Sequence, residues 1–323
     1  MAASRGPGTI GTKQNPGRIP EGIRGRNLAF PGPVGGDAWS EAARKAGVLP
    51  GGPGNRVAPS ARQRAEEIVR QFARRTGTGA FKYILRSAVA KGLLQRVQVP
   101  SMIDQAASSL CGPAALLYDL ATRDPERYAS YVISLYETGY GVIGKLEVKP
   151  GTDLKEHDPG TTVEASDWIA LASLRDSENY FFDYQEASDA FAGITLPGEL
   201  EDWFEKTGYT DVVNDARVIV DQEEGNIRRA DGYFHKGYRV CLFIHSNMLY
   251  KSKQSNGSAT PDHWVVLTSP VSVGMAIVAG GPKRTISFTI YTWGKGRRPV
   301  PETGVLTVDE FLDNYYGFVA ARY

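Results

Sequence analysis

Cysteine is scarce in this sequence of 323 residues, which contains only Cys111 and Cys241, and histidine occurs at four positions. Two cysteines exclude the disulfide framework that holds many small secreted domains together. The ligand spacings of zinc sites, such as two cysteines separated by two residues, are absent, so we expect no bound metal. We expect no cofactor either, because the glycines of residues 75–81 follow a predicted helix and lack the Lys-Ser/Thr pair of a phosphate-binding loop.

Long apolar runs are also missing. No stretch of about 18 apolar residues occurs, which excludes a membrane-spanning helix. The first twenty residues include basic side chains but no apolar core, so we expect no secretory signal peptide. The sequence therefore predicts a protein that is cytoplasmic in the cell that makes it, and any export would use a specialised route.

Charge is unevenly distributed along the chain, although the net charge is only +1. Residues 1–99 contain 17 Lys and Arg against 5 Asp and Glu, whereas residues 100–323 contain 20 against 31. A basic segment can bind an anionic partner or can simply be a solvated tail, and both alternatives stay open. Nucleic-acid binding through residues 1–99 is a third hypothesis, which we do not expect, because few aromatic side chains are interleaved with the basic residues of this segment to support base stacking.

Two regions differ in composition. Residues 1–57 are rich in glycine and proline, as in PGPVGG and LPGGPG, and show no sustained apolar period, so we expect a flexible arm. From residue 58 to residue 323 the pattern predicts one folded domain. Its first half, to about residue 210, has helical periodicity, and its second half, from about 211, is rich in β-branched and aromatic residues.

Helices that precede an antiparallel sheet in this way predict an α+β fold. The helix near 60–75 is amphipathic, with Ile68, Val69 and Phe72 as its apolar stripe. Further helices are predicted at about 79–94, 111–121, 125–137, 165–176, 197–207 and 308–316, and strands at 238–250, 263–269, 273–279 and 285–293.

Cys111 opens the predicted helix that is apolar nearly all round, with Pro113 in its first turn. The amino terminus of a helix lowers the pKa of a thiol because unpaired N–H groups and the helix dipole stabilise the thiolate. Small residues at 106–109 and Gly112 leave room for a substrate carbonyl beside the sulfur. The alternative is a cysteine that merely packs in the core, which is what we expect of Cys241.

A base for this thiol must come from one of the four histidines. His263 opens the strand HWVVLTS directly after the mostly polar residues 250–262, so it is both rigidly held and close to the surface. His245, in CLFIHSN, is the alternative, with a structural hydrogen bond as its expected role. His157 and His235 lie in polar, loop-like surroundings. We therefore predict His263 as the base.

Gln105 stands six residues before Cys111, and this Gln-x5-Cys-Gly arrangement resembles the start of the papain-like cysteine peptidases and amidases. The H-W-V-V segment that begins at His263 and the Trp293-Gly294 pair are similar to the same family. The resemblance implies a nucleophile helix packed on the antiparallel sheet, with Gln105 as an oxyanion donor. It also implies that Gly112, Trp264 and Trp293 line the substrate site.

The third catalytic position departs from the family, which usually has Asn or Asp two residues before the Trp-Gly pair. Tyr291 stands there in this sequence. A phenol can orient an imidazole but lacks the negative charge that stabilises imidazolium. The residues thus support a Cys–His dyad assisted by Tyr291 more than a complete triad.

The resemblance implies a cysteine hydrolase that cleaves an amide bond of a protein or peptide substrate. Protease, deamidase, transglutaminase and peptidoglycan amidase all stay open, because residues 140–235 match nothing that would define the substrate cleft. A basic arm before a compact hydrolase is similar to bacterial effector toxins, which implies a secretion apparatus and an immunity or inhibitor protein as partners. The competing hypothesis is a catalytically silent papain-like module, which Tyr291 favours.

Overall fold

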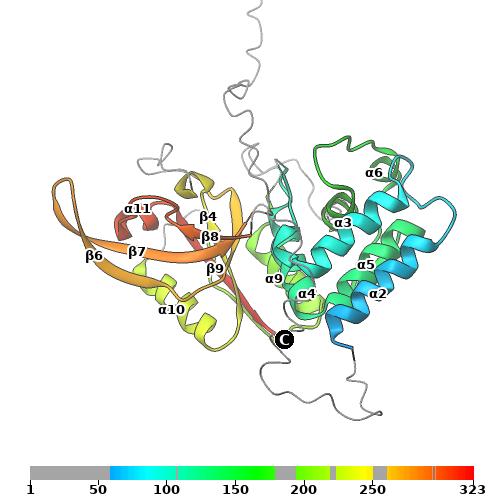
Figure 1. Cartoon of the computed structure of the whole chain (residues 1–323). Helices are drawn as coiled ribbons and strands as arrows, with labels where there is room; N and C mark the ends of the chain where they lie inside the picture. The colour runs from blue at the N-terminus through cyan, green and yellow to red at the C-terminus, as the bar shows by residue number, and fades with distance from the viewer. Residues whose placement is uncertain are drawn as a thin grey trace, which may run out of the picture. The chain divides into compact units, whose positions relative to one another are not determined.

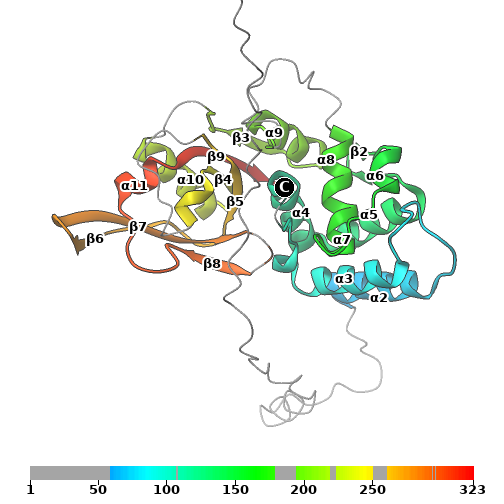
Figure 2. The same cartoon turned by 90° about the horizontal axis from the view of Figure 1, so that it is seen from above.

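The computed structural model describes residues 59–106, 108–178, 194–218, 223–249, 260–292, 294 and 296–323. They combine helices with an antiparallel sheet, which confirms the predicted α+β class (Figures 1 and 2). The expected arm, residues 1–57, lies outside the described residues. No helix in the described ranges is long and apolar enough to cross a bilayer.

The first half of the domain is helical, and α4 lies at its centre. Every α4 residue from Cys111 to Ala121 is buried, which agrees with its almost uniformly apolar sequence. The elements of this half are α2 (Ala61–Arg74), α3 (Arg86–Gln98), η1 (Pro100–Met102), α4 (Cys111–Arg123), α5 (Pro125–Thr138), β1 (Gly141–Ile143), β2 (Leu146–Val148), α6 (Thr152–Glu156), α7 (Ala165–Asp167), η2 (Trp168–Ala172), α8 (Ser173–Glu178) and α9 (Pro197–Lys206).

The second half is a sheet with the strand order β3-β9-β4-β5-β7-β6, and β8 also pairs with β7. All neighbouring strands are antiparallel. Its elements are β3 (Asp211–Asn214), α10 (Glu224–His235), β4 (Arg239–Ile244), η5 (Ser246–Leu249), β5 (His263–Leu267), β6 (Ser272–Val278), β7 (Gly281–Tyr291), β8 (Arg297–Val300), α11 (Val308–Leu312) and β9 (Tyr315–Arg322).

The two faces of the sheet belong to different cores, because successive side chains of a strand point to opposite sides. Cys241, Phe243 and Trp264 pack with the helical half around α4. Leu242 and Val265 pack on the other side, with α10 and α11. One face of β4 and β5 therefore lies against the helix that begins at Cys111.

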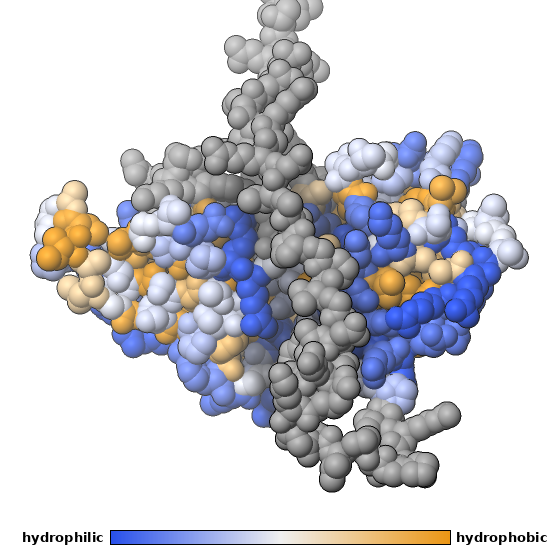
Figure 3. Space-filling model, in the orientation of Figure 1, coloured by the Kyte–Doolittle hydropathy of each residue, from blue (hydrophilic) through white to orange (hydrophobic). Residues whose placement is uncertain are grey.

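The hairpin of β6 and β7 projects from the sheet (Figure 1). Its outer strand exposes Val273, Met275 and Ile277, the last with 90% of its surface accessible. An apolar patch is visible at this end of the molecule in Figure 3. Isolated exposed apolar residues are ordinary, but three on alternate positions of one strand form a continuous strip.

A buried ion pair ties α4 to the sheet. Asp119 of α4 is 3% exposed and accepts hydrogen bonds from Arg239 of β4 and from the hydroxyl of Tyr209. Arg123, one turn further along α4, lies over the ring of Tyr209. The nucleophile helix is thus fixed to β4 by charge as well as by apolar packing.

Several predicted boundaries were wrong. The second helix begins at Arg86 instead of residue 79, because the N–H groups of Ala80 and Lys82 donate to the carbonyls of Tyr136 and Lys155. The strand predicted at 238–250 ends at residue 244 and is followed by the short helix η5. The helix predicted at 308–316 ends at residue 312, and residues 315–322 form the unpredicted strand β9.

Candidate active site

Cys111 is the first residue of α4, as predicted, and its side chain is buried, with 2% exposed. Burial raises the pKa of the Cys111 thiol to about 11. Hydrogen bonds from the backbone N–H groups of Trp264, Gly112 and Cys111 lower the pKa by less, and the carboxylate of Asp262 raises it further. At neutral pH this conformation therefore holds a protonated thiol, and the lowered pKa predicted from the helix amino terminus was wrong because burial outweighs it.

His263 is the first residue of β5 and is also buried, with 3% exposed. Its Nε2 and the hydroxyl oxygen of Thr292 share a hydrogen bond of 2.7 Å. Burial lowers the pKa of His263 to about 3, so the imidazole is neutral at pH 7. Trp264, the next residue along β5, packs in the same core as Cys111, whereas His263 pairs with Ile244, which packs in the other core.

Tyr291 does not orient His263, so that prediction was wrong. In the register of β5 and β7, Tyr291 pairs with Val266 and shares its face of the sheet, toward the helical half. Its ring stacks on Tyr118 at 3.9 Å, and its hydroxyl donates to the carbonyl of Ile103 at 2.7 Å. The next residue, Thr292, bonds His263 in its place.

Gln105 lies in the loop before α4 and is 6% exposed. Its side-chain amide donates to the carbonyl of Ser108 at 3.0 Å, so one of its N–H groups closes the loop. An amide has two N–H groups, and the second is the one that an oxyanion would require. The conformation of the loop before α4 therefore decides whether the second N–H of Gln105 is available to an oxyanion.

Gly112, Trp264 and Trp293 were expected to line the substrate site, and the structure describes the first two. A Cβ on Gly112 would come within 2.2 Å of the Thr195 hydroxyl oxygen, so glycine permits close packing there. The indole of Trp264 stacks on Phe243 at 4.3 Å and donates to the carbonyl of Thr195 at 2.7 Å. Both residues face the segment at Thr195, while Trp293 lies outside the described residues.

The other histidines have structural contacts. The Nδ1 of His245 accepts the N–H of Asn247 at 3.1 Å in the turn after β4, in line with its expected structural role. His157 stacks on Trp168, and His235 ends α10. Cys241 is fully buried in the core of the sheet, as its apolar strand predicts.

Three features near the site were not predicted. Thr292 could have been identified only from the strand register, which decides the face that each residue takes. The hydroxyl of Thr195 is buried and has no hydrogen-bond partner among the described residues. The ion pair of Arg96 and Asp167 joins positions 71 residues apart, so no local motif reveals it.

No known protein family matches this sequence, and no curated protein matches it either. Functional conclusions therefore depend on the residues and their geometry. The described residues also contain no group of three or more His, Cys, Asp and Glu placed to hold a metal ion.

Proposed function

We propose that residues 58–323 form a papain-like cysteine hydrolase that cleaves an amide bond with Cys111 and His263. The observation that carries this proposal is that Cys111 begins the buried helix α4, which packs in one core with Trp264 of β5, the strand that His263 begins. The packing of this helix on an antiparallel sheet supports the same family. The polar partner at Thr292 supports His263 as the base, because it holds the ring in one orientation.

In this proposal His263 takes the thiol proton, and the thiolate attacks the substrate carbonyl carbon. The negative charge on the carbonyl oxygen is stabilised by the N–H of Cys111 and by Gln105. The imidazolium returns the proton to the leaving amine, which departs as a thioester forms. Water, deprotonated by His263, then hydrolyses the thioester and restores the thiol.

Activation requires a change in solvation. Burial keeps the thiol and the imidazole of the described structure in their neutral forms, since it raises the pKa of Cys111 and lowers that of His263. Opening of the site by substrate would move both pKa values back toward each other and favour the ion pair. We therefore propose that substrate binding and thiol activation are coupled.

The test uses p-nitrophenyl acetate, an activated ester that acylates a reactive cysteine and releases a coloured product. We expect a burst that Cys111→Ser abolishes and that His263→Asn slows on the order of 100-fold. His245→Asn is the matched control, because it removes a histidine near the same end of the sheet, and it should leave the burst almost unchanged. A burst that survives Cys111→Ser, or equal effects of the two histidine variants, would contradict the proposal.

A catalytically silent papain-like module is the second candidate. The burial of both proposed reactive groups favours it, as does the absence of a carboxylate or amide where Tyr291 was expected to act. The acylation experiment separates the candidates, since a silent module gives no burst that depends on Cys111.

We further propose that the hydrolase acts on a protein, peptide or peptidoglycan amide in a target bacterial cell, with an immunity or inhibitor protein as its partner. The support comes from the sequence, in which a basic arm precedes a compact domain, an order that resembles bacterial effector toxins. The arm itself lies outside the described residues. Production of the intact chain and of Cys111→Ala in bacterial cytoplasm and periplasm tests this. Equal growth of the two strains in both compartments would contradict it.

A further inference from the structure

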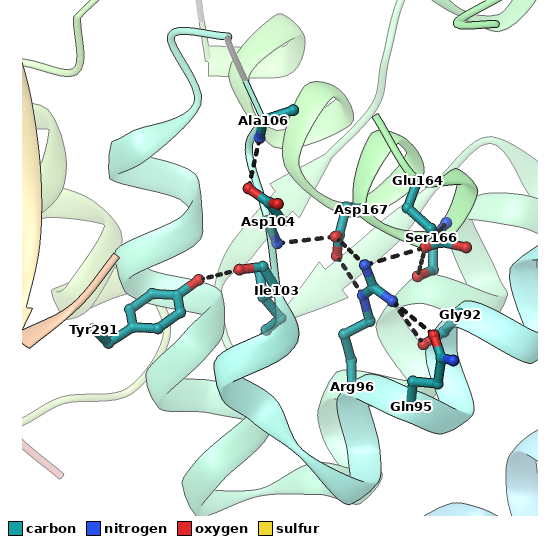
Figure 4. A network of polar contacts seen from close by, with 10 residues as sticks. All are labelled: Gly92, Gln95, Arg96, Ile103, Asp104, Ala106, Glu164, Ser166, Asp167 and Tyr291. Carbon is teal, nitrogen blue, oxygen red and sulfur yellow. Dashed lines mark hydrogen bonds and ion pairs between the residues drawn. The ribbon is translucent and has the colours of Figure 1, made fainter. Parts of the chain in front are cut away.

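The peptide group that joins Ile103 to Asp104, in the loop before Cys111, is held at both ends by side chains from distant parts of the chain (Figure 4). The carbonyl of Ile103 accepts the hydroxyl of Tyr291 at 2.7 Å. The N–H of Asp104, in the same peptide group, donates to Asp167 Oδ2 at 2.9 Å. Tyr291 comes from β7 in the sheet and Asp167 from α7 among the helices, so both halves of the domain fix this peptide.

Asp167 is itself held by Arg96 of α3. The guanidinium donates to both carboxylate oxygens, Nε to Oδ1 at 3.0 Å and Nη2 to Oδ2 at 2.6 Å. Asp167 is fully buried, and Arg96 is 4% exposed. A buried ion pair gives little net stability, because removal of two charges from water offsets their attraction. The ion pair instead fixes the position of Asp167 Oδ2, which accepts the N–H of Asp104.

The residues that follow the clamped peptide are also constrained. Asp104 Oδ1 accepts the N–H of Ala106 at 2.8 Å, so the side chain spans Gln105. Ala106 has a φ of +52°, a left-handed conformation that costs about 1–2 kcal/mol for a residue with a Cβ. Such strain persists only where neighbouring contacts hold it, and it concentrates at functional sites.

Gly294 completes the enclosure from the sheet side. A Cβ on this residue would lie 2.3 Å from the Cβ of Asp104, so the segment after β7 lies directly against the loop. The N–H of Gly296 also donates to the carbonyl of Ser101. The loop that carries Gln105 is therefore held between the sheet and the helices.

We infer that Tyr291 and the Asp167–Arg96 pair are positioning residues that set Gln105 for stabilisation of an oxyanion beside Cys111. This inference rests on the proposed hydrolase function and assigns no contact with the reacting atoms to the three residues. Because the clamp needs one side chain from each half of the domain, movement of the sheet against the helices would release Gln105. Correct packing of the two halves is thus a condition for oxyanion stabilisation.

The experiment compares two reactions of Cys111. Acylation by p-nitrophenyl acetate passes through an oxyanion, whereas alkylation by iodoacetamide, followed on the Cys111 peptide by mass spectrometry, does not. Tyr291→Phe keeps the ring that stacks on Tyr118 and removes only the hydroxyl. We expect it to reduce the ratio of acylation to alkylation about tenfold. The effect is smaller than the roughly 100-fold loss caused by removal of a whole oxyanion donor, because Gln105 is still present but less well positioned.

Tyr131→Phe is the matched control. Tyr131 is equally buried, and its hydroxyl donates to the carbonyl of Ala170 at 3.1 Å, a bond of the same kind outside the loop. We expect a similar loss of stability in both variants but an unchanged ratio in Tyr131→Phe. A purely structural role for Tyr291 predicts that both variants keep the wild-type ratio.

The double variant Arg96→Met/Asp167→Leu tests the other side of the clamp, because it removes both charges of this pair, and Glu164, which lies 3.5 Å from Arg96, keeps its hydrogen bonds from Ser166. It should lower the same ratio as Tyr291→Phe does. Where the double variant does not fold, Tyr291→Phe decides alone.

An unchanged ratio in Tyr291→Phe, with a normal wild-type burst, overturns the positioning role and leaves the hydrolase intact. A wild-type protein without a burst that depends on Cys111 overturns the proposed function and the positioning role together.

Discussion

Thr292 holds the imidazole of His263 through a hydrogen bond of 2.7 Å, and both side chains are buried. A threonine hydroxyl can fix the ring but carries no charge to stabilise imidazolium. Thr292 therefore supplies no charge to oppose burial, which is the largest cause of the pKa shifts of both proposed reactive groups.

Replacement of Thr292 by valine removes this hydrogen bond with little change in shape. We expect the acylation rate of Cys111 to fall on the order of tenfold, because His263 loses its orientation. Tyr291→Asn should give no gain in acylation, although it restores the residue type that the family favours, because that side chain lies on the other face of the sheet. A faster Tyr291→Asn enzyme would contradict this register of β5 and β7.

Acid should destabilise the protein through His263. Burial lowers the pKa of His263 from 6.5 to about 3, so between these values the unfolded chain binds a proton that the folded protein does not. The free energy of unfolding therefore falls as the pH drops from 6.5 toward 3, by up to about 1.4 kcal/mol per pH unit from this group. Urea titrations between pH 7 and pH 4 should show a shallower dependence in His263→Gln. A slope in His263→Gln equal to that of the wild type would contradict this linkage.

The ion pair between Asp119 and Arg239 should contribute strongly to stability when only one partner is removed. We expect Asp119→Ala to lower the free energy of unfolding by about 3–5 kcal/mol, since it leaves Arg239 without its buried counter-charge. The exposed pair of Arg284 and Glu224 provides the comparison, and Arg284→Ala should cost much less stability than Asp119→Ala. Chemical denaturation measures both, and equal losses would contradict the assignment of Asp119 as the link between α4 and the sheet.

Gly112 has no room for a side chain. Gly112→Ala places a Cβ 2.2 Å from the Thr195 hydroxyl oxygen, and we expect a loss of about 1–3 kcal/mol from overpacking. Gly232→Ala, in the last turn of α10 with open space around it, should instead stabilise the protein by up to about 1 kcal/mol. Thermal denaturation of the two alanine variants gives opposite shifts if the packing at Thr195 is as described.

Local patterns predicted the elements that carry Cys111 and His263. The helix at Cys111 follows from Pro113 and the apolar run behind it, and the strand at His263 follows from its β-branched residues. Both predictions use only residues that are close in sequence, so they do not require knowledge of tertiary contacts.

Contacts between distant residues could not be predicted in the same way. Whether Tyr291 or Thr292 faces His263 depends on the register between β5 and β7, and a slip of one residue reverses the answer. The partner of Arg96 lies 71 residues away, and nothing in the local sequence indicates the pairing. The predicted helix at 308–316 overlaps the first two residues of β9, because the capping box of Thr307 and Glu310 indicates where a helix begins but not where it ends.

The place of β9 between β3 and β4 has a consequence for the assembly of the protein on the ribosome. Residues 315–322 fill an interior row of the sheet, so β3 has no neighbour and β4 has an open edge until those residues are synthesised. A chain cut short before them should misassemble and be degraded instead of persisting as a shortened protein. The sheet that packs against α4 thus reaches its final form only after residues 315–322 have been translated.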